Sequence, residues 1–326
     1  MRFILAGSTR PSVSTATTAA LVSLLLSAAV RADDTFPLHV ADIRVRDPFI
    51  LPVPETQTYY LYANAANRTK GARGWECYRS KDLLHWSEPT TVFTPPENFW
   101  GTRDFWAPEV HRYRGRYYLF GTLSAADRCR GTQIFQADSP LGPFRPHSDD
   151  AATPHDWFAL DGTLWLEDGN PWMVFCHEWV QIGDGTMCAV RLSDDLSCTI
   201  GPITTLFAAS DAPWVRPVRD GDKYVTDGPC LYRTAAGTLW MLWSSFTDKG
   251  YAVGVARSRS GSITGPWTHD PEPLFVGGGH SMLFKRFDGT WMLALHSPNR
   301  SPDERIKFFE FVEANDRCTL APWPKQ

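Results

Sequence analysis

The sequence lacks the signatures of several protein classes. It contains no Cys-x-x-Cys pair and no tight Cys/His cluster, which argues against a structural zinc site. It also has no Asp-x-Asp-x-Asp-Gly loop of the kind that binds calcium. Beyond residue 32, no segment approaches the roughly 18 consecutive apolar residues of a membrane-spanning helix. We therefore do not expect the mature protein to be an integral membrane protein.

An excess of positive charge is also missing. The chain has 32 Lys and Arg against 36 Asp and Glu, a formal net charge of −4. Residues 1–32 hold three Arg and no acid, so the chain without them has 29 basic and 36 acidic residues. A mildly acidic surface argues against nucleic acid and anionic lipid as main partners.

Residues 1–32 have the layout of a secretory signal peptide. Arg2 and Arg10 precede an apolar stretch from Ala19 to Val30, and Ala32 ends the segment before the acidic residues begin. The apolar stretch is too short to span a bilayer. This pattern predicts a secreted, extracellular protein whose folded domain covers residues 33–326.

Export would permit disulfide bonds among the seven cysteines. An odd number leaves at least one thiol free or paired between chains, and the spacing assigns no pairs. We expect most of these side chains to be buried, unreactive thiols. They are Cys77, Cys129, Cys176, Cys188, Cys198, Cys230 and Cys318.

A recurring strand pair organises the rest of the chain. Each copy has a short apolar strand, a Gly-, Asp- or Asn-containing turn such as Asp168-Gly169-Asn170, and an aromatic-rich strand. The copies begin at residues 47, about 107, 161, 227 and 280, at intervals of 60, 54, 66 and 53. Gly 24, Pro 25 and 13% aromatic residues also favour turns and strands.

Five such units predict an all-β, single-domain, five-bladed β-propeller with little helix. The alternative is a two-sheet sandwich. It would give shorter strand spacing and no five-fold recurrence of a strand start marked by Pro or Gly. The recurrence therefore favours the propeller.

The strand openings carry acids. The first strand of each propeller blade lines the central channel, so residues opening these strands converge at one mouth. Carboxylates gathered in this way suit hydrolysis of a glycosidic bond, in which one protonates the leaving oxygen and another activates water or attacks the sugar. Metal binding by the acids is the competing interpretation. The openings are Asp47, Glu109, Asp161, Asp227 and His280.

Motifs in all five units resemble those of glycoside hydrolase family 43. The resemblance covers residues 41–311, in order and spacing. It implies a five-bladed propeller and an α-L-arabinofuranosidase, β-xylosidase, arabinanase or galactanase. The motifs are Arg46-Asp47-Pro48, Phe105-Trp106-Ala107-Pro108-Glu109, Leu160-Asp161-Gly162, Thr226-Asp227-Gly228-Pro229 and Gly278-Gly279-His280.

The resemblance also implies roles. Asp47 matches the family's general base, which activates water in an inverting reaction, and Asp161 matches the aspartate that positions the acid and adjusts its pKa. The family's general acid is a Glu before Gly-Pro, whereas this chain has the shorter Asp227. Glu178 is the second candidate for the acid, because the strand before it returns it to the face where Asp161 begins. The position of Asp227 in the repeated motif favours it as the acid, whereas the longer side chain of Glu178 favours Glu178. Glu178 could instead form hydrogen bonds to sugar hydroxyls.

Further contacts follow from the same resemblance. It implies that Arg305 contacts the sugar at the cleavage point. It also implies that His280 faces the channel, where a calcium or sodium ion could be held through waters, and that no cofactor is required. Aromatic faces at the mouth can stack on sugar rings. The expected substrate contacts are Phe49, Trp106, Glu109, Trp179, Phe246 and Arg305.

The resulting hypothesis is a secreted, monomeric, exo-acting glycosidase of plant or fungal polysaccharides, with α-L-arabinofuranosidase preferred. A base and an acid in blades one and four would lie across the channel, and the wider separation of about 6.5–9.5 Å goes with inversion. A β-xylosidase, a galactofuranosidase or galactanase, and a non-catalytic carbohydrate-binding propeller remain open. An interaction propeller of the WD40 or kelch kind has signatures that this chain lacks, and has no reason to gather acids.

Overall fold

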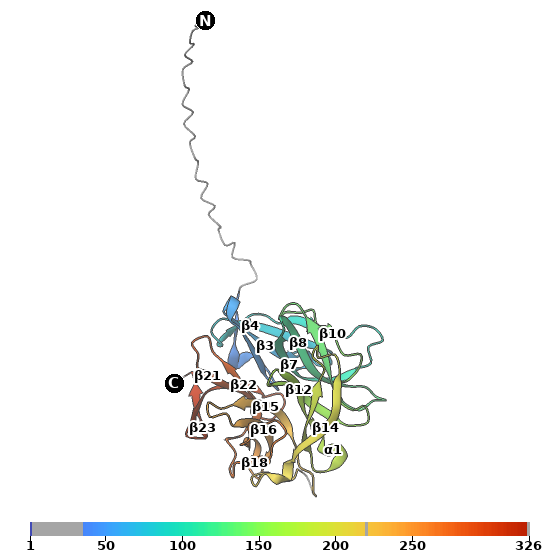
Figure 1. Cartoon of the computed structure of the whole chain (residues 1–326), viewed down its shortest axis with the longest axis vertical. Coiled ribbons are helices and arrows are strands. Elements are labelled where there is room, and N and C mark those ends of the chain that lie inside the picture. Colours follow the sequence, from blue (N-terminus) through green and yellow to red (C-terminus); the bar gives the residue numbers. More distant parts are fainter. Residues whose placement is uncertain (2–34, 219–220, 325–326) are drawn as a thin grey trace. The chain divides into compact units, whose positions relative to one another are not determined.

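Five antiparallel sheets follow one another along the chain and stand around a ring (Figure 1). The computed structural model describes Met1, residues 35–218 and residues 221–324, and every sheet lies in the compact unit Thr35–Gln326. The predicted single-domain, five-bladed β-propeller is confirmed. The predicted signal peptide, Met1 apart, lies outside the described residues.

The sheets are the blades. Blade 1 contains β1 (Leu38–His39), β2 (Phe49–Val53), β3 (Thr58–Asn64), β4 (Trp75–Ser80), β5 (His85–Trp86) and β6 (Thr90–Phe93). Blade 2 contains β7 (Arg103–Tyr113), β8 (Arg116–Ser124), β9 (Gly131–Ala137) and β10 (Arg145–Pro146). Blade 3 contains β11 (Ala159–Glu167), β12 (Asn170–His177), β13 (Thr186–Leu192) and β14 (Thr199–Ala208).

The last two blades follow the same plan. Blade 4 contains β15 (Asp227–Arg233), β16 (Leu239–Thr247), β17 (Gly250–Ser258), β18 (Trp267–His269) and β19 (Phe275–Val276). Blade 5 contains β20 (Gly279–Lys285), β21 (Trp291–Ser297), β22 (Arg305–Ala314) and β23 (Arg317–Trp323).

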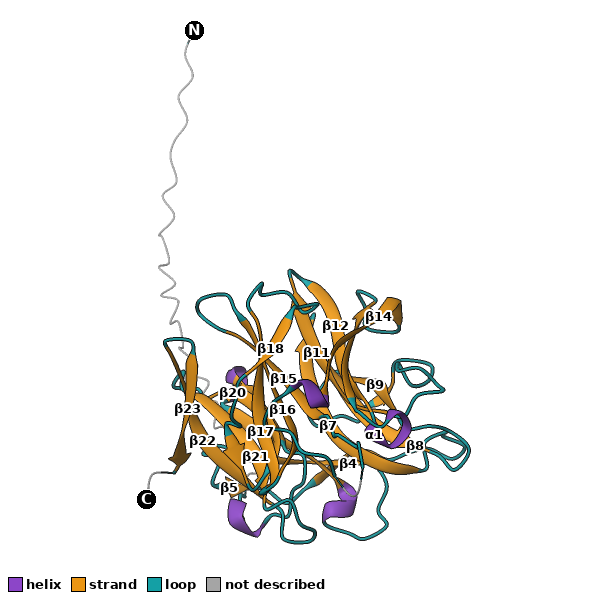
Figure 2. Ribbon diagram, turned by 90° about the horizontal axis from the view of Figure 1, so that it is seen from below, coloured by secondary structure: helices purple, strands orange, loops and turns teal. Residues whose placement is uncertain are grey.

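Helix is confined to short segments in the described part of the chain (Figure 2). None of the helices there has the length and apolar character needed to cross a membrane. The segments are α1 (Trp179–Ile182) and the 3-10 turns η1 (Val40–Asp42), η2 (Pro54–Thr56), η3 (Ala65–Asn67) and η4 (Ala209–Asp211).

The innermost strand of each blade faces the axis. Neighbouring inner strands contact one another in the cycle β2, β7, β11, β15, β20 and back to β2, so the ring is closed. They surround a channel cavity of about 410 Å³, which residues of all five strands line. In blade 1 the channel strand is β2, because β1 pairs with β5 at the outer edge of the sheet; in the other four blades it is the first strand, as predicted.

The tight turns follow from their sequences. Arg114-Gly115 joins β7 to β8, and Asp168-Gly169 joins β11 to β12. All four residues have positive φ, at 46°, 83°, 50° and 79°. Two consecutive residues of this kind form the type I′ turn, whose twist matches that of paired strands.

Glu304 fastens the seam where the first blade meets the last. Its carboxylate is fully buried and accepts hydrogen bonds from Arg44 Nε and Arg46 Nη1, both at 3.3 Å. In the described residues, no strand of blade 1 pairs with a strand of blade 5. An isolated β-bridge between Arg44 and Arg305 of β22, the side-chain ion pairs and the contacts between β2 and β20 close this seam.

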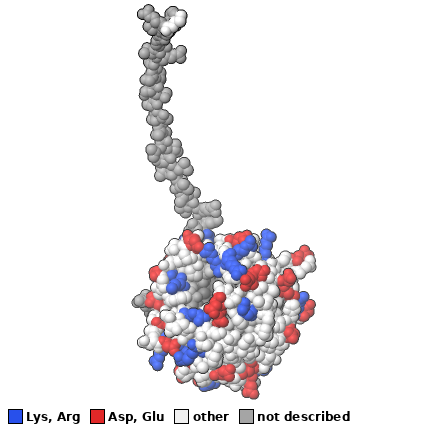
Figure 3. All heavy atoms as spheres, viewed as in Figure 1, with Lys and Arg blue, Asp and Glu red and all other residues white. Residues whose placement is uncertain are grey.

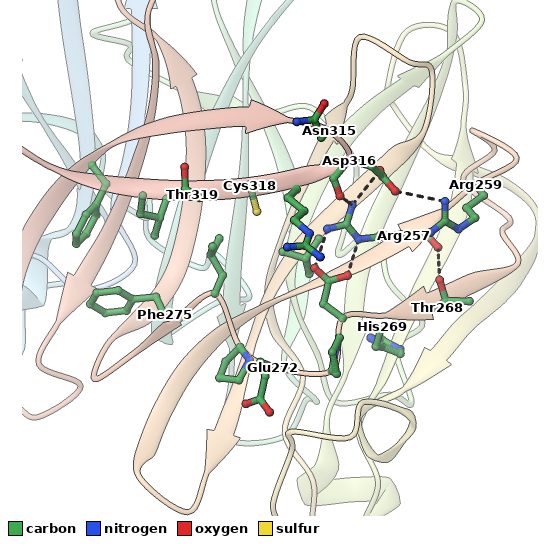
Figure 4. Close-up of a pocket in the computed structure, with 18 of the residues that line it drawn as sticks. Arg257, Arg259, Thr268, His269, Glu272, Phe275, Asn315, Asp316, Cys318 and Thr319 are labelled. Atoms are coloured by element: carbon green, nitrogen blue, oxygen red, sulfur yellow. Dashed lines mark hydrogen bonds and ion pairs between the residues drawn. The ribbon is translucent and has the colours of Figure 1, made fainter.

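Arg257 fastens the seam between blades 4 and 5, beside a groove of about 950 Å³ (Figure 4). Its side chain is 7% exposed and lies 4.1 Å from the centre of the Trp240 ring. Nη2 donates to Asp270 Oδ2 at 2.7 Å, and Nη1 donates to Asp316 Oδ1 at 3.1 Å. One arginine thus joins the segment that follows β18 in blade 4 to the β22–β23 turn of blade 5.

All seven cysteines are free thiols. Cys77, Cys176 and Cys188 are buried, whereas Cys198 is exposed. Packing and ion pairs rather than disulfide bonds hold the blades together. On the face drawn in Figure 3, acidic and basic side chains are interspersed, as the near balance of charge in the sequence implies.

Candidate active site

A polar pocket of about 460 Å³ lies where the inner strands begin. All five blades or their connecting segments contribute to its wall, so side chains surround it on every side of the axis. The lining residues are Arg44, Arg46, Asp47, Asn64, Ala66, Asn67, Trp106, Leu160, Asp161, Glu178, Asp227, Tyr251, His280, Ser301 and Glu304.

An irregularity at the start of every inner strand creates this wall. One equivalent position at each opening has positive φ, and the strand register shifts there in β7, β11, β15 and β20. A bulge of this kind bends the strand and redirects its side chains. At non-glycine positions such a conformation costs roughly 1–3 kcal/mol and recurs at functional sites. The residues are Asp47 (53°), Ala107 (39°), Asp161 (57°), Gly228 (51°) and His280 (52°).

The bulges sort the strand openings into three layers. Residues with positive φ include Asp47, Asp161 and His280, whose side chains contact one another. Residues one position earlier line the pocket: Arg46, Trp106, Leu160 and Asp227. Residues two positions later line the channel cavity instead: Phe49, Glu109, Thr163, Cys230 and Met282.

This layering corrects the predicted phase in two blades. Ala107 and Gly228, not Glu109 and Asp227, are the equivalents of Asp47. Glu109 therefore points into the channel, where its Oε2 lies 3.2 Å from His111 Nε2, and it does not line the pocket. Phe49 lies in the same channel layer and is likewise outside the pocket wall. Neither residue is placed for the substrate contact predicted from the sequence.

Asp47 lies among cationic and imidazole groups. Its Oδ1 lies 3.2 Å from His280 Nδ1, 3.3 Å from His296 Nδ1 and 3.9 Å from Arg46 Nε. Burial alone would raise the pKa of Asp47, but the charges of His280 and Arg46 and the bond to His296 hold it well below its ordinary value. Asp47 is therefore an ionised carboxylate over a wide range of pH.

The pKa values of Asp161 and Asp227 are shifted in the opposite direction, upward. Burial, Asp227 and Asp47 raise the pKa of Asp161 well above its ordinary value, although its Oδ2 accepts a 2.9 Å bond from the Gly228 amide. Burial also raises the pKa of Asp227; His280 and the Tyr251 hydroxyl, which donates to Asp227 Oδ2 at 2.9 Å, oppose this rise. Neighbouring carboxylates whose pKa values are pushed apart are typical of acid–base sites.

Glu178 occupies another part of the wall, directly before α1. Its side chain is 7% exposed and forms an ion pair with Arg130. Burial raises the pKa of Glu178, and the neighbouring Arg130 opposes that rise. Glu178 thus lines the same pocket as Asp161, at the end of strand β12 as predicted.

The remaining predicted contacts divide clearly. Trp106 is 37% exposed and lines the pocket, and so does His280. Trp179 begins α1 and Phe246 packs on the Tyr251 ring at 5.0 Å, and neither is among the residues that line the pocket. The pocket wall thus includes one of the four aromatic residues predicted to stack on sugar.

The structure places Arg305 away from the pocket, where a sugar contact was predicted for it. Its guanidinium donates to the backbone oxygens of Ala41, Pro302 and Glu304, at 3.0, 3.1 and 2.8 Å, and does not line the pocket. These bonds tie the start of β22 to the segment before blade 1. The arginine that enters the pocket beside Asp47 is Arg46.

Sequence reasoning missed His296, Tyr251, Arg46 and Arg130. His296 is fully buried and stacks on the Tyr251 ring at 5.7 Å, which links the surroundings of Asp47 to those of Asp227. Tyr251 and His296 lie on β17 and β21, outside the strand openings that carry the recurring motifs. Arg46 could have been identified from the sequence. It lies one position before Asp47, just as Asp227 lies one position before Gly228, the equivalent of Asp47.

The family resemblance implies an ion held near His280 through waters. His280 Nδ1 is engaged with Asp47 and lies 3.7 Å from Asp161 Oδ2. Across residues 35–218 and 221–324, no group of three His, Cys, Asp or Glu side chains is arranged to hold a metal ion. These side chains do not by themselves form an ion site.

Comparisons with known proteins agree with this geometry. A family model described as "Glycosyl hydrolases family 43" matches residues 39–316. "Extracellular endo-alpha-(1->5)-L-arabinanase 1" of Bacillus subtilis (strain 168) is 24% identical over 247 residues, 71% of this chain and 70% of that protein. "Extracellular exo-alpha-(1->5)-L-arabinofuranosidase ArbA" of Cellvibrio japonicus is 26% identical over 278 residues, 74% and 72% of the two chains.

A solved structure is more similar in sequence. The crystal structure of an endo-arabinase from Bacteroides thetaiotaomicron VPI-5482 superposes with a TM-score of 0.82 at 43% identity. The match covers 87% of this chain and 100% of that one. The similarity thus extends over most of this chain.

Proposed function

Since the chain belongs to the glycosyl hydrolases family 43, we propose that it is an inverting, exo-acting α-L-arabinofuranosidase of plant or fungal polysaccharides. The family makes the chain a glycosidase, and the matched relatives act on arabinan or on its arabinofuranosyl ends, as their names state. The proposal adds the mode of attack, the stereochemistry and the roles of individual residues.

The observation that supports acid–base chemistry is the divergence of pKa values in one pocket. Asp47 is held ionised, whereas Asp161 and Asp227 are pushed toward the protonated form. Glycosidic hydrolysis needs both states at the same pH, one to take a proton from water and one to give a proton to the leaving oxygen. Asp47 is the proposed base because, of these three aspartates in the pocket, it is the one whose pKa is lowered.

Asp227 is the proposed general acid. In the described part of the chain the Tyr251 hydroxyl donates to its carboxylate and no ion pair is formed with it; burial raises its pKa against the opposing charges of His280 and Arg46. Glu178 stands second, because its ion pair with Arg130 stabilises the ionised form that an acid must avoid. Asp161, bonded to the Gly228 amide beside Asp227, is proposed to position the acid and to sustain its raised pKa.

The shape of the pocket supports exo-action. Side chains from all five blades surround about 460 Å³, within the usual range for sites that enclose a small ligand. Such a wall accepts the end of a chain more readily than its middle. A terminal arabinofuranose would enter along the axis, with the rest of the substrate extending outward past Trp106.

The products released from linear α-1,5-arabinan test this proposal. An exo-enzyme releases arabinose from the first minutes, and proton NMR should show the inverted anomer as the first product. The 43% identical endo-arabinase supports a second candidate, endo-action on the same polymer. Early release of oligosaccharides without arabinose would favour endo-action, and a retained first anomer would contradict inversion.

Secretion is proposed from residues 1–32. Expression of the full chain should place the protein in the medium, with its mature N-terminus at Asp33. Retention of the leader in the cell-associated protein would contradict this proposal. We also expect a monomer, which light scattering of the purified enzyme tests.

A further inference from the structure

Two partly buried arginines of this propeller have nearly the same surroundings. Arg257 lies 4.1 Å over the Trp240 ring and pairs with Asp270 and Asp316. Arg130 lies 4.2 Å over the Trp106 ring and pairs with two carboxylates of its own. Both combine a cation stacked on an indole with two ion pairs, and such contacts are strong when shielded from water.

The difference lies in where the partners point. The two carboxylate partners of Arg257 line the groove between blades 4 and 5 (Figure 4). The partners of Arg130 include Trp106 and Glu178, which both line the catalytic pocket, whereas Arg130 itself does not. Its second carboxylate is Asp104, at 3.2 Å from Nη2, outside the pocket wall.

Asp104 is anchored in turn. Its Oδ2 accepts a 2.6 Å hydrogen bond from Ser124 Oγ, on the neighbouring strand β8 of the same blade. Arg130 is 15% exposed and is therefore held between a fixed carboxylate on one side and the two pocket residues on the other. A hydrogen bond and two ion pairs thus connect Ser124 and Asp104 of blade 2, through Arg130, to Glu178 of blade 3.

We propose that Arg130 is a positioning residue that holds the Glu178 carboxylate and the Trp106 ring as one rigid unit of the sugar-binding wall. Arg130 covers one face of the indole, so the exposed face is the one left for a sugar ring. Its planar, forked guanidinium can stack on the indole while donating to two carboxylates in its own plane, a geometry that the point charge of a lysine ammonium does not reproduce. The unit exists only because blades 2 and 3 meet at Arg130.

The arrangement predicts a kinetic coupling. Without Arg130, the Glu178 carboxylate and the Trp106 ring would each lose their fixed orientation. Misplacement of a substrate-positioning group by about 1 Å can cost on the order of 10²-fold in rate. Substitution of Trp106 or Glu178 in an enzyme already lacking Arg130 should then cost much less than in the wild type, since residues acting as a unit are not additive.

The experiment compares Arg130→Met with Arg257→Met as the matched control. For each, kcat/KM is measured on the aryl or oligosaccharide substrate that the wild type hydrolyses best, and Tm is measured in parallel. Both variants should lose Tm. We expect Arg130→Met to lose about 10²-fold in kcat/KM, and Arg257→Met to keep the wild-type value per folded molecule.

Double variants provide the decisive readout. Arg130→Met combined with Trp106→Ala, and separately with Glu178→Gln, should lose clearly less than the product of the single losses. Additive losses, or equal wild-type kcat/KM in Arg130→Met and Arg257→Met, would overturn the proposal and leave Arg130 a structural clamp like Arg257.

Milder variants cover the case in which Arg130→Met does not fold. Arg130→Lys keeps the charge but loses the fork, and Asp104→Asn releases the outer anchor while leaving Arg130 in place. Each should lower kcat/KM in a folded enzyme, and wild-type values in both would overturn the proposal. Because every comparison uses a substrate that the wild type hydrolyses, failure of the arabinofuranosidase assignment would appear separately, as a wild-type enzyme inactive on arabinofuranosides.

Discussion

The Gly228 amide donates a 2.9 Å hydrogen bond to Asp161 Oδ2, across the gap between blades 4 and 3. This bond anchors the third-blade carboxylate to the residue that follows Asp227. Gly228 has φ +51°, and a Cβ there would lie 2.9 Å from the His280 ring. The equivalent positions of the other blades hold non-glycine residues with similar φ, so the space beside His280, more than the conformation, favours a glycine here.

Gly228→Ala should consequently damage the site more than the fold. The methyl group would push against His280 and weaken the Asp161 bond, in addition to the roughly 1–2 kcal/mol cost of a left-handed alanine. We expect a folded enzyme with reduced Tm and kcat at least about tenfold lower, because acid and base depend on positions within a fraction of an ångström. Gly169→Ala is the control: it also has positive φ, but nothing lies within 4 Å of its Cβ. Equal kcat losses in both would contradict the argument.

Asp47→Asn should remove nearly all turnover. The substitution keeps the shape of the side chain but removes the group that takes a proton from water, and loss of a general base typically costs about 10²–10⁴ in rate. The variant should still fold and still bind arabinooligosaccharides, which calorimetry can check. A variant that retained more than about a tenth of wild-type kcat would not be consistent with a base at Asp47.

The two acid candidates separate by their dependence on the leaving group. An activated dinitrophenyl leaving group departs without a proton, whereas a natural sugar alcohol needs one. Asp227→Ala should therefore slow natural oligosaccharides far more than dinitrophenyl arabinofuranosides, by about 10²–10⁴ against a much smaller factor. Glu178→Ala should slow both alike. The reverse pattern would transfer the acid role to Glu178, and uniform losses in both variants would reject both.

The acidic limb of the pH–rate profile should respond to His296. The pKa of Asp47 is held low by its cationic neighbours and by His296, so the wild type keeps its base ionised in acid solution. His296→Asn removes one of these influences and lets the pKa of Asp47 rise. Activity should then be lost at a higher pH on the acidic side, while the basic limb, set by the acid, stays in place.

His269→Asn is the matched control for that profile. His269 packs between Phe207 and Trp243, with ring centroids at 4.7 and 5.6 Å, and does not line the catalytic pocket. It should leave both limbs unchanged. An unchanged acidic limb in folded His296→Asn would show that His296 does not influence the base.

Arg46 and Arg305 offer a direct test of the corrected site. Arg46→Met removes a pocket cation beside Asp47 and should lower kcat/KM by about tenfold or more, since charged hydrogen bonds contribute roughly 1.5–3 kcal/mol. Arg305→Met loses bonds to backbone oxygens and should lower Tm with little change in KM. Steady-state kinetics and thermal melts of both variants measure this. A large rise in KM for Arg305→Met alone would restore the role implied by the family resemblance.

Much of the architecture could be predicted from local patterns. The strand pairs alternate with turns such as Asp168-Gly169, whose preferred φ values fix the hairpin independently of the rest of the chain. Five such units cannot each bury a sheet alone, so they stack around an axis. The sequence therefore predicted the propeller, and with it the convergence of Asp47, Asp161 and His280.

The sequence also contained the correct alignment of the five strand openings, but aligning them on their acidic residues concealed it. Aligned on the residue that follows the positive-φ position, the five openings read Asp47-Pro48, Ala107-Pro108, Asp161-Gly162, Gly228-Pro229 and His280-Ser281. Alignment on the carboxylates instead placed Glu109 two residues, and Asp227 one residue, out of phase. Glu109 therefore belongs to the layer two residues after the positive-φ position, with Phe49 and Thr163, which is why it lies in the channel.

Only the tertiary structure decided which groups act on the carboxylates. His296 reaches Asp47 from 249 positions away, and Arg130 reaches Glu178 from 48. These contacts cross from blade to blade, where no periodicity or turn preference operates, and they depend on how the blades are rotated against one another. Local chemistry along the chain determined the five blades and the three residues that meet at the axis. Packing between the blades decided that Arg46 rather than Arg305 enters the pocket, because the guanidinium of Arg305 is already bonded to backbone oxygens at the seam.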